Sequence, residues 1–206
     1  MQISLNNIGK RYNYEWIFRG VNHEFNSNEN YVILGSNGSG KSTLLQVIGG
    51  NLSHSEGEIG YLINDTKIAS EQIFEHIAIA TPYQQLFEEF TLKEAFEFHR
   101  KFKPLKANIS TNEAIELLEF NNVTNKEIRH FSSGMKQRAK LGLAILSDTP
   151  LLLLDEPTSN LDKNGIKWYQ NLVNDYSSNR LIIVCSNQQE HEYEFCTKEL
   201  LIEDYK

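Results

Sequence analysis

Short runs of apolar residues recur along this chain, and each is bounded by polar or turn residues. Four of these runs lie at residues 31–34, 76–80, 151–154 and 181–185. Runs in which nearly every position is apolar are typical of strands buried on both faces of a parallel sheet, because helices cover both sides of such a sheet. The pattern therefore predicts a parallel α/β core.

The N-terminal residues show a different pattern, with apolar side chains spaced for shorter strands. These side chains are Ile3, Leu5, Ile8 and Tyr12, followed by Ile59, Tyr61 and Ile63. A spacing of two residues places side chains on one face of a strand. We expect these segments to form an antiparallel β layer.

A third region, beginning near residue 91, has helical signals. Thr91-Leu92-Lys93-Glu94 and Ser110-Thr111-Asn112-Glu113 both match the capping box, and Pro104 lies between the two predicted helices. We therefore expect an inserted helical subdomain at about residues 86–140.

Composition and length are ordinary for a globular protein of one domain. The chain has 206 residues, of which 40% are hydrophobic and 23% are charged. No apolar run approaches the roughly 18 residues needed to cross a bilayer, and the N-terminus shows no basic region followed by an apolar stretch. We expect a cytosolic location. A formal net charge of −7 argues against a nucleic-acid-binding surface.

One glycine-rich segment carries a specific chemical signal. It satisfies the pattern G-x-x-x-x-G-K-[ST] with Gly35, Ser36, Asn37, Gly38, Ser39, Gly40, Lys41, Ser42 and Thr43. In such a phosphate loop, backbone N–H groups surround the phosphates, Lys41 reaches the β- and γ-phosphates, and the hydroxyl of Ser42 binds Mg²⁺. An apolar run precedes the segment and a helical pattern follows it, up to Gly49-Gly50. The chain is predicted to bind a nucleoside triphosphate with Mg²⁺ on a P-loop NTPase core.

A second candidate site follows the apolar run at 151–154. The next two residues are Asp155 and Glu156. Asp155 is placed to hold Mg²⁺, and Glu156 to polarise the water that attacks the γ-phosphate. The alternative is that two acidic residues simply end a strand at the surface. The presence of a phosphate loop in the same chain favours the catalytic interpretation.

Taken together, these segments and five others resemble the ATP-binding subunits of ABC transporters. The five are Phe131 to Arg138, similar to the signature L-S-G-G-Q-x-x-R, then Ser159 to Asp162, Tyr12, Thr81 to Leu86, and Ser186-Asn187. The signature lies about 20 residues before Asp155, and Tyr12 lies 29 residues before Lys41, as in that family. The match extends over almost the whole chain.

The resemblance implies roles for several of these residues. Tyr12 would stack on adenine, and Asp162 would belong to the loop that follows the catalytic glutamate. Gln84 would sense the γ-phosphate and Mg²⁺, with Gln85 as the alternative. Ser132 and Gly134 would contact a phosphate, because Ser132 and Ser133 can cap a helix whose N–H groups face an anion.

The sequence departs from the family pattern at three places. Ser133 and Met135 replace the usual glycine and glutamine of the signature, and the glutamine loop is shorter than usual before Thr91. Asn187 replaces the histidine that contacts the γ-phosphate. An asparagine amide can donate a hydrogen bond, but it cannot carry a proton or a positive charge.

The expected function is ATP binding and hydrolysis in a subunit that powers a separate membrane permease. The resemblance implies a second ATPase subunit as partner, a copy of this chain or a relative, packed head to tail so that each signature faces the other subunit's γ-phosphate. The alternatives are a regulatory subunit that hydrolyses little ATP, favoured by Asn187, and an ATP-driven clamp without transport. The aromatic residues Tyr83, Phe87 and Phe90 could dock a helix of the permease, but packing within the helical subdomain is the favoured expectation.

Overall fold

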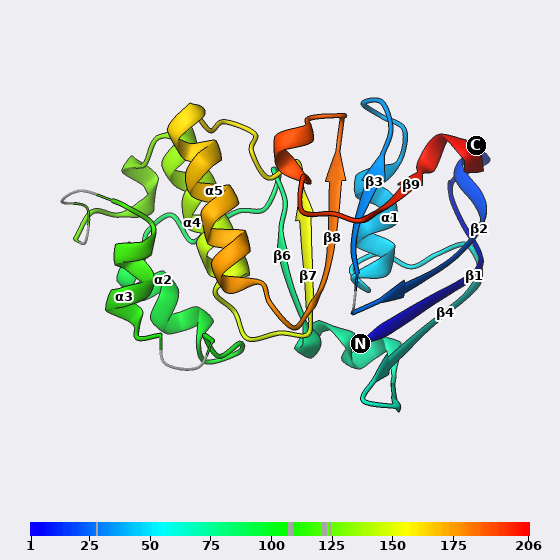
Figure 1. Cartoon of the computed structure of the whole chain (residues 1–206), viewed down its shortest axis with the longest axis horizontal. Helices are drawn as coiled ribbons and strands as arrows, with labels where there is room; N and C mark the ends of the chain where they lie inside the picture. Colours follow the sequence, from blue (N-terminus) through cyan, green and yellow to red (C-terminus); the bar gives the residue numbers. More distant parts are fainter. Residues whose placement is uncertain (28, 107–108, 121–122, 124) are drawn as a thin grey trace. The chain divides into compact units, whose positions relative to one another are not determined.

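The computed structural model of this chain describes residues 1–27, 29–106, 109–120, 123 and 125–206. The chain forms two units (Figure 1). Unit 1 consists of Met1–Ile79, Pro150–Glu156 and Asn179–Lys206, and unit 2 consists of Ala80–Thr149 and Pro157–Ser178.

A five-stranded sheet contains all four apolar runs that were predicted to be strands. In spatial order its strands are β6 (Ile77–Ala80), β7 (Leu151–Asp155), β8 (Leu181–Ser186), β3 (Asn30–Leu34) and β9 (Lys198–Leu201). Strands β7, β8, β3 and β9 pair in parallel, which confirms the predicted parallel core. Helix α1 (Lys41–Ile48) contacts β7 and β8 (Figure 1).

A four-stranded antiparallel sheet forms the second layer of unit 1. Its order is β2 (Glu15–Asn26), β1 (Gln2–Tyr12), β4 (Glu56–Ile63) and β5 (Thr66–Ile68). Both neighbours of β1 are antiparallel to it, so the predicted antiparallel layer is confirmed. The apolar faces of both sheets contribute to one buried core, with Ile3, Phe25 and Leu153 among its members.

Unit 2 is helical. It contains α2 (Leu92–His99), α3 (Thr111–Leu117), α4 (Ser133–Ile145) and α5 (Lys163–Tyr176). Both predicted capping boxes are present: the Thr91 and Ser110 hydroxyls accept hydrogen bonds from the N–H groups of Glu94 and Glu113, whose carboxylates accept from the N–H groups of the two caps.

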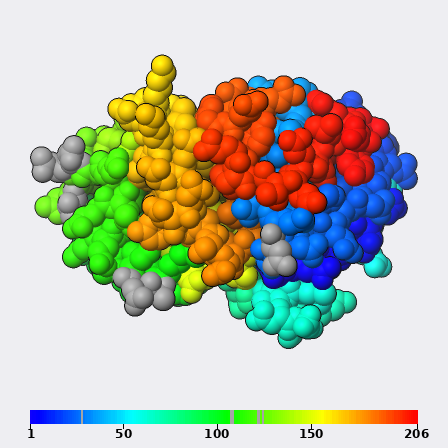
Figure 2. All heavy atoms as spheres, in the orientation of Figure 1, coloured from blue at the N-terminus to red at the C-terminus, as the bar shows by residue number. Residues whose placement is uncertain are grey.

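The described residues also contain four short 3₁₀ segments. They are η1 (Ser70–His76), η2 (Ile128–His130), η3 (Glu190–Glu192) and η4 (Ile202–Tyr205). Figure 2 shows the C-terminal residues, in red, at the surface of unit 1. Among the described residues, no helix has the length and apolar character that a membrane span requires.

Candidate functional site

The glycine-rich segment forms a loop between β3 and α1, as the sequence predicts. Gly40 is the N-cap of α1 and has φ of 103°, a left-handed conformation that glycine adopts without strain. Gly35 lies where the chain is crowded, because a Cβ atom there would be 2.5 Å from Ser39 Oγ and 2.7 Å from a methyl group of Ile202. Side chains at these two positions would therefore displace the loop.

The amino end of α1 faces this loop, and no side chain among the described residues caps its N–H groups. The first turn of the helix contains no acidic residue. Exposed N–H groups and the helix dipole favour an anion at this point. The local structure therefore suits a phosphate group.

Lys41, the first residue of α1, is almost fully buried. Its Nζ donates hydrogen bonds to the backbone oxygens of Gly35, over 2.8 Å, and Ser36, over 3.0 Å. The ammonium group is thus held inside the loop by carbonyl groups, which are weaker partners than phosphate oxygens. An entering phosphate chain would offer Lys41 stronger acceptors.

Asp155 contacts Ser42, a residue of the phosphate loop. Asp155 ends β7, its exposed fraction is 2%, and its carboxylate is hydrogen-bonded to Ser42. Burial raises the pKa of Asp155 to about 6, against the opposing effect of the Ser42 hydrogen bond. Asp155 Oδ1 has no partner among the described residues. A hydroxyl beside a carboxylate with an unused oxygen is a donor set that fits Mg²⁺.

Glu156 adopts an unusual backbone conformation. Its φ is 42°, in the left-handed region that non-glycine residues rarely occupy, and its N–H donates to the oxygen of Cys185 over 2.9 Å. The side chain is partly exposed. Strained backbone of this kind is often found at functional sites.

Asn187 follows β8 and reaches the phosphate loop. Its Nδ2 donates to Asn37 Oδ1 over 3.4 Å. Tyr12 lies at the end of β1, where it pairs with Glu15 of β2, and 49% of its surface is exposed. Unit 1 therefore brings together the loop, Asp155 and Asn187, and it leaves the Tyr12 ring accessible.

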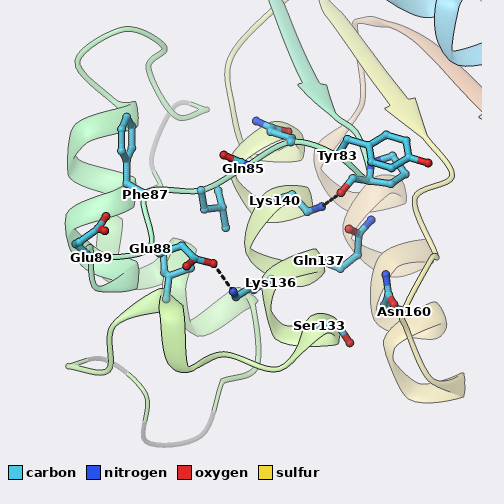
Figure 3. A pocket seen from close by; sticks show the side chains of 14 residues that line it. Tyr83, Gln85, Phe87, Glu88, Glu89, Ser133, Lys136, Gln137, Lys140 and Asn160 are labelled. Carbon is cyan, nitrogen blue, oxygen red and sulfur yellow. Dashed lines mark hydrogen bonds and ion pairs between the residues drawn. The ribbon is translucent and has the colours of Figure 1, made fainter.

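The glutamine loop belongs to unit 2 and lines a pocket of about 640 Å³ (Figure 3). Lys140 of α4 donates to the backbone oxygens of Thr81 and Pro82, over 3.0 and 2.9 Å, and so attaches the start of the loop to the helix. Gln84 and Gln85 both line the pocket and both are exposed. The choice of Gln84 over Gln85 stays a prediction.

The aromatic residues beside this loop are more exposed than expected. Tyr83 is 89% exposed, so the expectation of packing within the helical subdomain is wrong for this residue. Phe87 is 58% exposed, but its ring lies 5.4 Å from that of Phe98 in α2, so it packs at the surface of the helical subdomain. The rings of Phe87 and Phe90 lie 5.1 Å apart. Tyr83 and Phe87 add an exposed apolar surface beside the pocket.

The signature residues line a second pocket of unit 2, of about 540 Å³. Ser132 is the N-cap of α4, and its hydroxyl accepts from the N–H of Met135 over 3.2 Å, which confirms the predicted cap. Gly134 lies close to Asn160, whose oxygen would be 3.0 Å from a Cβ atom at Gly134. Asp162 lines the same pocket and caps α5. The fold thus gathers Ser132, Gly134 and Asp162.

One polar contact of the phosphate loop is not indicated by any motif in the sequence. Glu203 of η4 accepts hydrogen bonds from the N–H and the hydroxyl of Ser36. The two residues are 167 positions apart, and no motif joins them. The only local signal is the apolar pair Leu200-Leu201, which marks a short strand before Glu203.

Comparison with known proteins agrees with the geometry. The family model described as "ABC transporter" matches residues 18–159. The chain belongs to the ABC transporter family. Its α/β fold, with a glycine-rich loop between a parallel strand and a helix, is also that of a solved ATP-binding cassette.

Two curated relatives from Bacillus subtilis illustrate the similarity. The ABC transporter ATP-binding protein YcbN is 29% identical over 87% of this chain and 60% of its own length. The linearmycin resistance ATP-binding protein LnrL is 29% identical over 92% of this chain and 62% of its own length. The chain therefore spans about 60% of the length of these ABC relatives.

A solved structure shares the fold. It is the ATP-binding cassette MJ0796, determined as a dimer in a post-hydrolysis state bound to ADP and phosphate, with a TM-score of 0.79 and 23% identity. The match covers 98% of this chain and 94% of that one.

Proposed function

We propose that this protein is the ATP-binding and ATP-hydrolysing subunit of an ABC transporter that powers a separate membrane permease. The observation that supports this best is the edge of the parallel sheet at which β3, β7 and β8 end. Strand register pairs Asp155 with Cys185 and Leu34 with Ser186, so the phosphate loop, Asp155 and Asn187 follow neighbouring strand ends. Ligands of open α/β sheets bind at such an edge.

Binding of the triphosphate rests on the loop and on Lys41. The loop N–H groups and the amino end of α1 would hold phosphate oxygens, and Lys41 would exchange the carbonyls of Gly35 and Ser36 for the β- and γ-phosphates. Ser42 and Asp155 would hold Mg²⁺, with Gln84 as a further ligand. When bound, that ion neutralises charge on the phosphates. Tyr12 would stack on adenine.

Hydrolysis rests on Glu156 and Asn187. Glu156 would orient the attacking water and accept its proton. Asn187 would donate a hydrogen bond to the γ-phosphate from a position it already holds beside Asn37. Catalysis of this kind depends mostly on positioning and on stabilisation of charge.

The signature supports a head-to-tail dimer with a second ATPase subunit. Ser132 and Gly134 line an open pocket at the amino end of α4, a 13-residue helix suited to an anion. A second subunit would place its γ-phosphate there, so that ATP holds the dimer together and hydrolysis releases it. A dimer is also the state of the MJ0796 cassette structure.

The pocket beside the glutamine loop supports docking of a permease. Tyr83 and Phe87 expose apolar surface at its rim, and Lys140 attaches the loop to α4. Such a surface suits an amphipathic helix of a partner. The protein would then act at the inner face of the cell membrane, held there by the permease.

ATP turnover by the purified protein, measured beside Glu156→Gln, tests the proposal. We expect the parent to hydrolyse ATP, and the variant to lose turnover by at least about 100-fold and to accumulate an ATP-bound dimer in light scattering. A parent without turnover, even when dimeric, would contradict the hydrolytic role.

A second candidate is a regulatory subunit that closes on ATP and hydrolyses little of it. The observation that favours it is Asn187, which has no proton to exchange near neutral pH. A parent that dimerises with ATP without turnover, and gains turnover on Asn187→His, would support this candidate over the first.

A further inference from the structure

Glu203 lies on the phosphate loop, although none of the roles above uses it. Its Oε1 accepts a hydrogen bond of 2.9 Å from the N–H of Ser36 and one of 2.6 Å from the Ser36 hydroxyl. Ser36 is the second residue of the loop, directly after Gly35. A carboxylate from the far end of the sequence thus binds both donors of one loop residue.

The fold fixes Glu203 at this place. Strand β9 pairs in parallel with β3, with Leu201 beside Leu34, so η4 begins where the phosphate loop begins. The side chain of Ile202 is fully buried and lies against Gly35, where a Cβ atom would be 2.7 Å from its methyl group. Packing of Ile202 therefore brings the next side chain, Glu203, onto Ser36.

Lys41 binds the backbone oxygen of Ser36. Its Nζ is 3.0 Å from the backbone oxygen of Ser36, while Glu203 binds the N–H. Lys41 must leave this oxygen to reach the phosphates. After that exchange, the backbone oxygen of Ser36 keeps its hydrogen bond from the N–H of Ser39, over 3.1 Å, within the loop. Glu203 holds Ser36 from outside the loop, through the N–H and the hydroxyl.

We propose that Glu203 is a positioning residue of the nucleotide site, which holds Ser36 so that the loop N–H groups stay directed at the phosphates when Lys41 moves to them. This inference rests on the proposed ATP-binding function. Hydrogen bonds to an ionised carboxylate are stronger than neutral ones. The negative charge itself acts in the opposite direction, because it repels the phosphates.

The two effects are separable by substitution. Glutamine keeps an oxygen acceptor at the same place and removes the charge, whereas alanine removes both. Asp204, the next residue in η4, is an exposed carboxylate and serves as the matched control. The probes are ADP, and ATP in the presence of EDTA, which prevents hydrolysis during calorimetric titration.

We expect Glu203→Ala to weaken the binding of both nucleotides about tenfold, which corresponds to ~1.4 kcal/mol. Glu203→Gln should bind closer to the parent than Glu203→Ala does, and Asp204→Ala should stay within about twofold of the parent. With Mg²⁺ and ATP, KM should rise in Glu203→Ala while kcat changes little. A purely structural role would not be rescued by glutamine in this way.

A second variant tests whether misfolding of Glu203→Ala causes its loss of binding. Ser36→Ala removes the hydroxyl donor and keeps the N–H, so it should weaken binding less than Glu203→Ala. In the double variant, the Ser36 change should add almost nothing to the loss. Independent, additive losses would overturn the inference.

Three other results would overturn it as well. Nucleotide binding by Glu203→Ala that equals or exceeds that of the parent would show that the carboxylate does not position the loop. Equal losses in Glu203→Gln and Glu203→Ala would assign the effect to charge. A parent that binds neither nucleotide would refute the proposed function itself, whereas a parent that binds both, with Glu203→Ala unchanged, would refute the positioning role alone.

Discussion

The charged residues of this site are held in place by hydrogen bonds to polar partners. Lys41 is buried against two carbonyl groups, and Asp155 is buried with Ser42 as its partner. A buried charge is costly unless it is paired, and buried ionisable residues of this kind are often found where a ligand binds. Asn187 is the residue whose chemistry departs most from the family pattern, and in the proposed mechanism it affects the rate of ATP hydrolysis.

We expect Asn187→His to raise the steady-state kcat of ATP hydrolysis by about three- to tenfold. An imidazole can donate to the γ-phosphate and also carry positive charge, and charge-assisted hydrogen bonds are stronger than neutral ones. The measurement is phosphate release at saturating ATP. Gln188→His, one position along the same turn, is the matched control and should leave kcat unchanged. Equal or lower turnover in Asn187→His would show that the amide already supplies what this site needs.

Helices and strands of this chain differ in how far local sequence determines them. The capping boxes at Thr91 and Ser110 are formed by residues three apart, and the sequence predicts both. Strand β2 was not predicted, because its buried residues Phe18, Val21 and Phe25 are spaced three and four apart, which is helical spacing. Register shifts in its pairing with β1 make this spacing compatible with a strand.

The capping box of α2 gives a prediction about stability. Thr91→Ala removes the hydroxyl that accepts from the Glu94 N–H and should lower the free energy of unfolding by ~1 kcal/mol. Urea denaturation followed by circular dichroism measures the change. Lys93→Ala in the same turn removes only an exposed ion pair with Glu97, so it should cost at most about 0.5 kcal/mol. Equal losses in the two variants would argue against a specific contribution of the cap.

His99, at the end of α2, makes the stability of the protein depend on pH. Its Nε2 is 2.7 Å from Ser147 Oγ, and this hydroxyl donates to the Leu143 oxygen, so His99 is the donor to Ser147. Burial lowers the pKa of His99 from 6.5 to about 4. Between these values the unfolded chain binds a proton that the folded chain does not. The stability contribution is therefore fully present above pH 6.5 and is lost as the pH falls toward 4.

The test is the pH dependence of the free energy of unfolding in the parent and in His99→Asn. Between pH 6 and 4.5 the parent should lose about 1–2 kcal/mol more than the variant does. Carboxylates titrate in both proteins, so the difference between the two curves isolates His99. Parallel curves would show that His99 binds its proton equally well in both states.

At the scale of the whole molecule, the predicted residues divide between the two units. The phosphate loop, Asp155, Glu156 and Asn187 belong to unit 1, whereas Gln84, Ser132, Gly134 and Asp162 belong to unit 2. In the proposed head-to-tail dimer, each catalytic site would combine the phosphate loop of one subunit with the signature of the other. Two inactive variants, one substituted in the phosphate loop and the other in the signature, would then regain activity when they are mixed.

We therefore expect a mixture of Lys41→Ala and Gly134→Asp chains to regain ATPase activity that each variant lacks alone. Half of the dimers in an equal mixture are mixed, and each has one intact site, so about a quarter of the parent's activity is the upper expectation. The measurement is phosphate release after mixing, with light scattering to follow dimers. A double variant carrying both changes in one chain, mixed with Lys41→Ala, is the control without any intact site. No recovery in the first mixture would contradict the head-to-tail arrangement.

Features whose parts are contiguous in the chain follow from the sequence alone. The phosphate loop, the Asp155-Glu156 pair and the helix caps each lie within a few residues, where backbone geometry alone brings the groups together. The tertiary structure alone decided which distant groups meet. The contacts of Glu203 with Ser36 and of Lys140 with Thr81 depend on strand order and helix packing, which place residues 167 and 59 positions apart within hydrogen-bonding distance. No local pattern encodes such a distance, because it arises only when all the strands have paired.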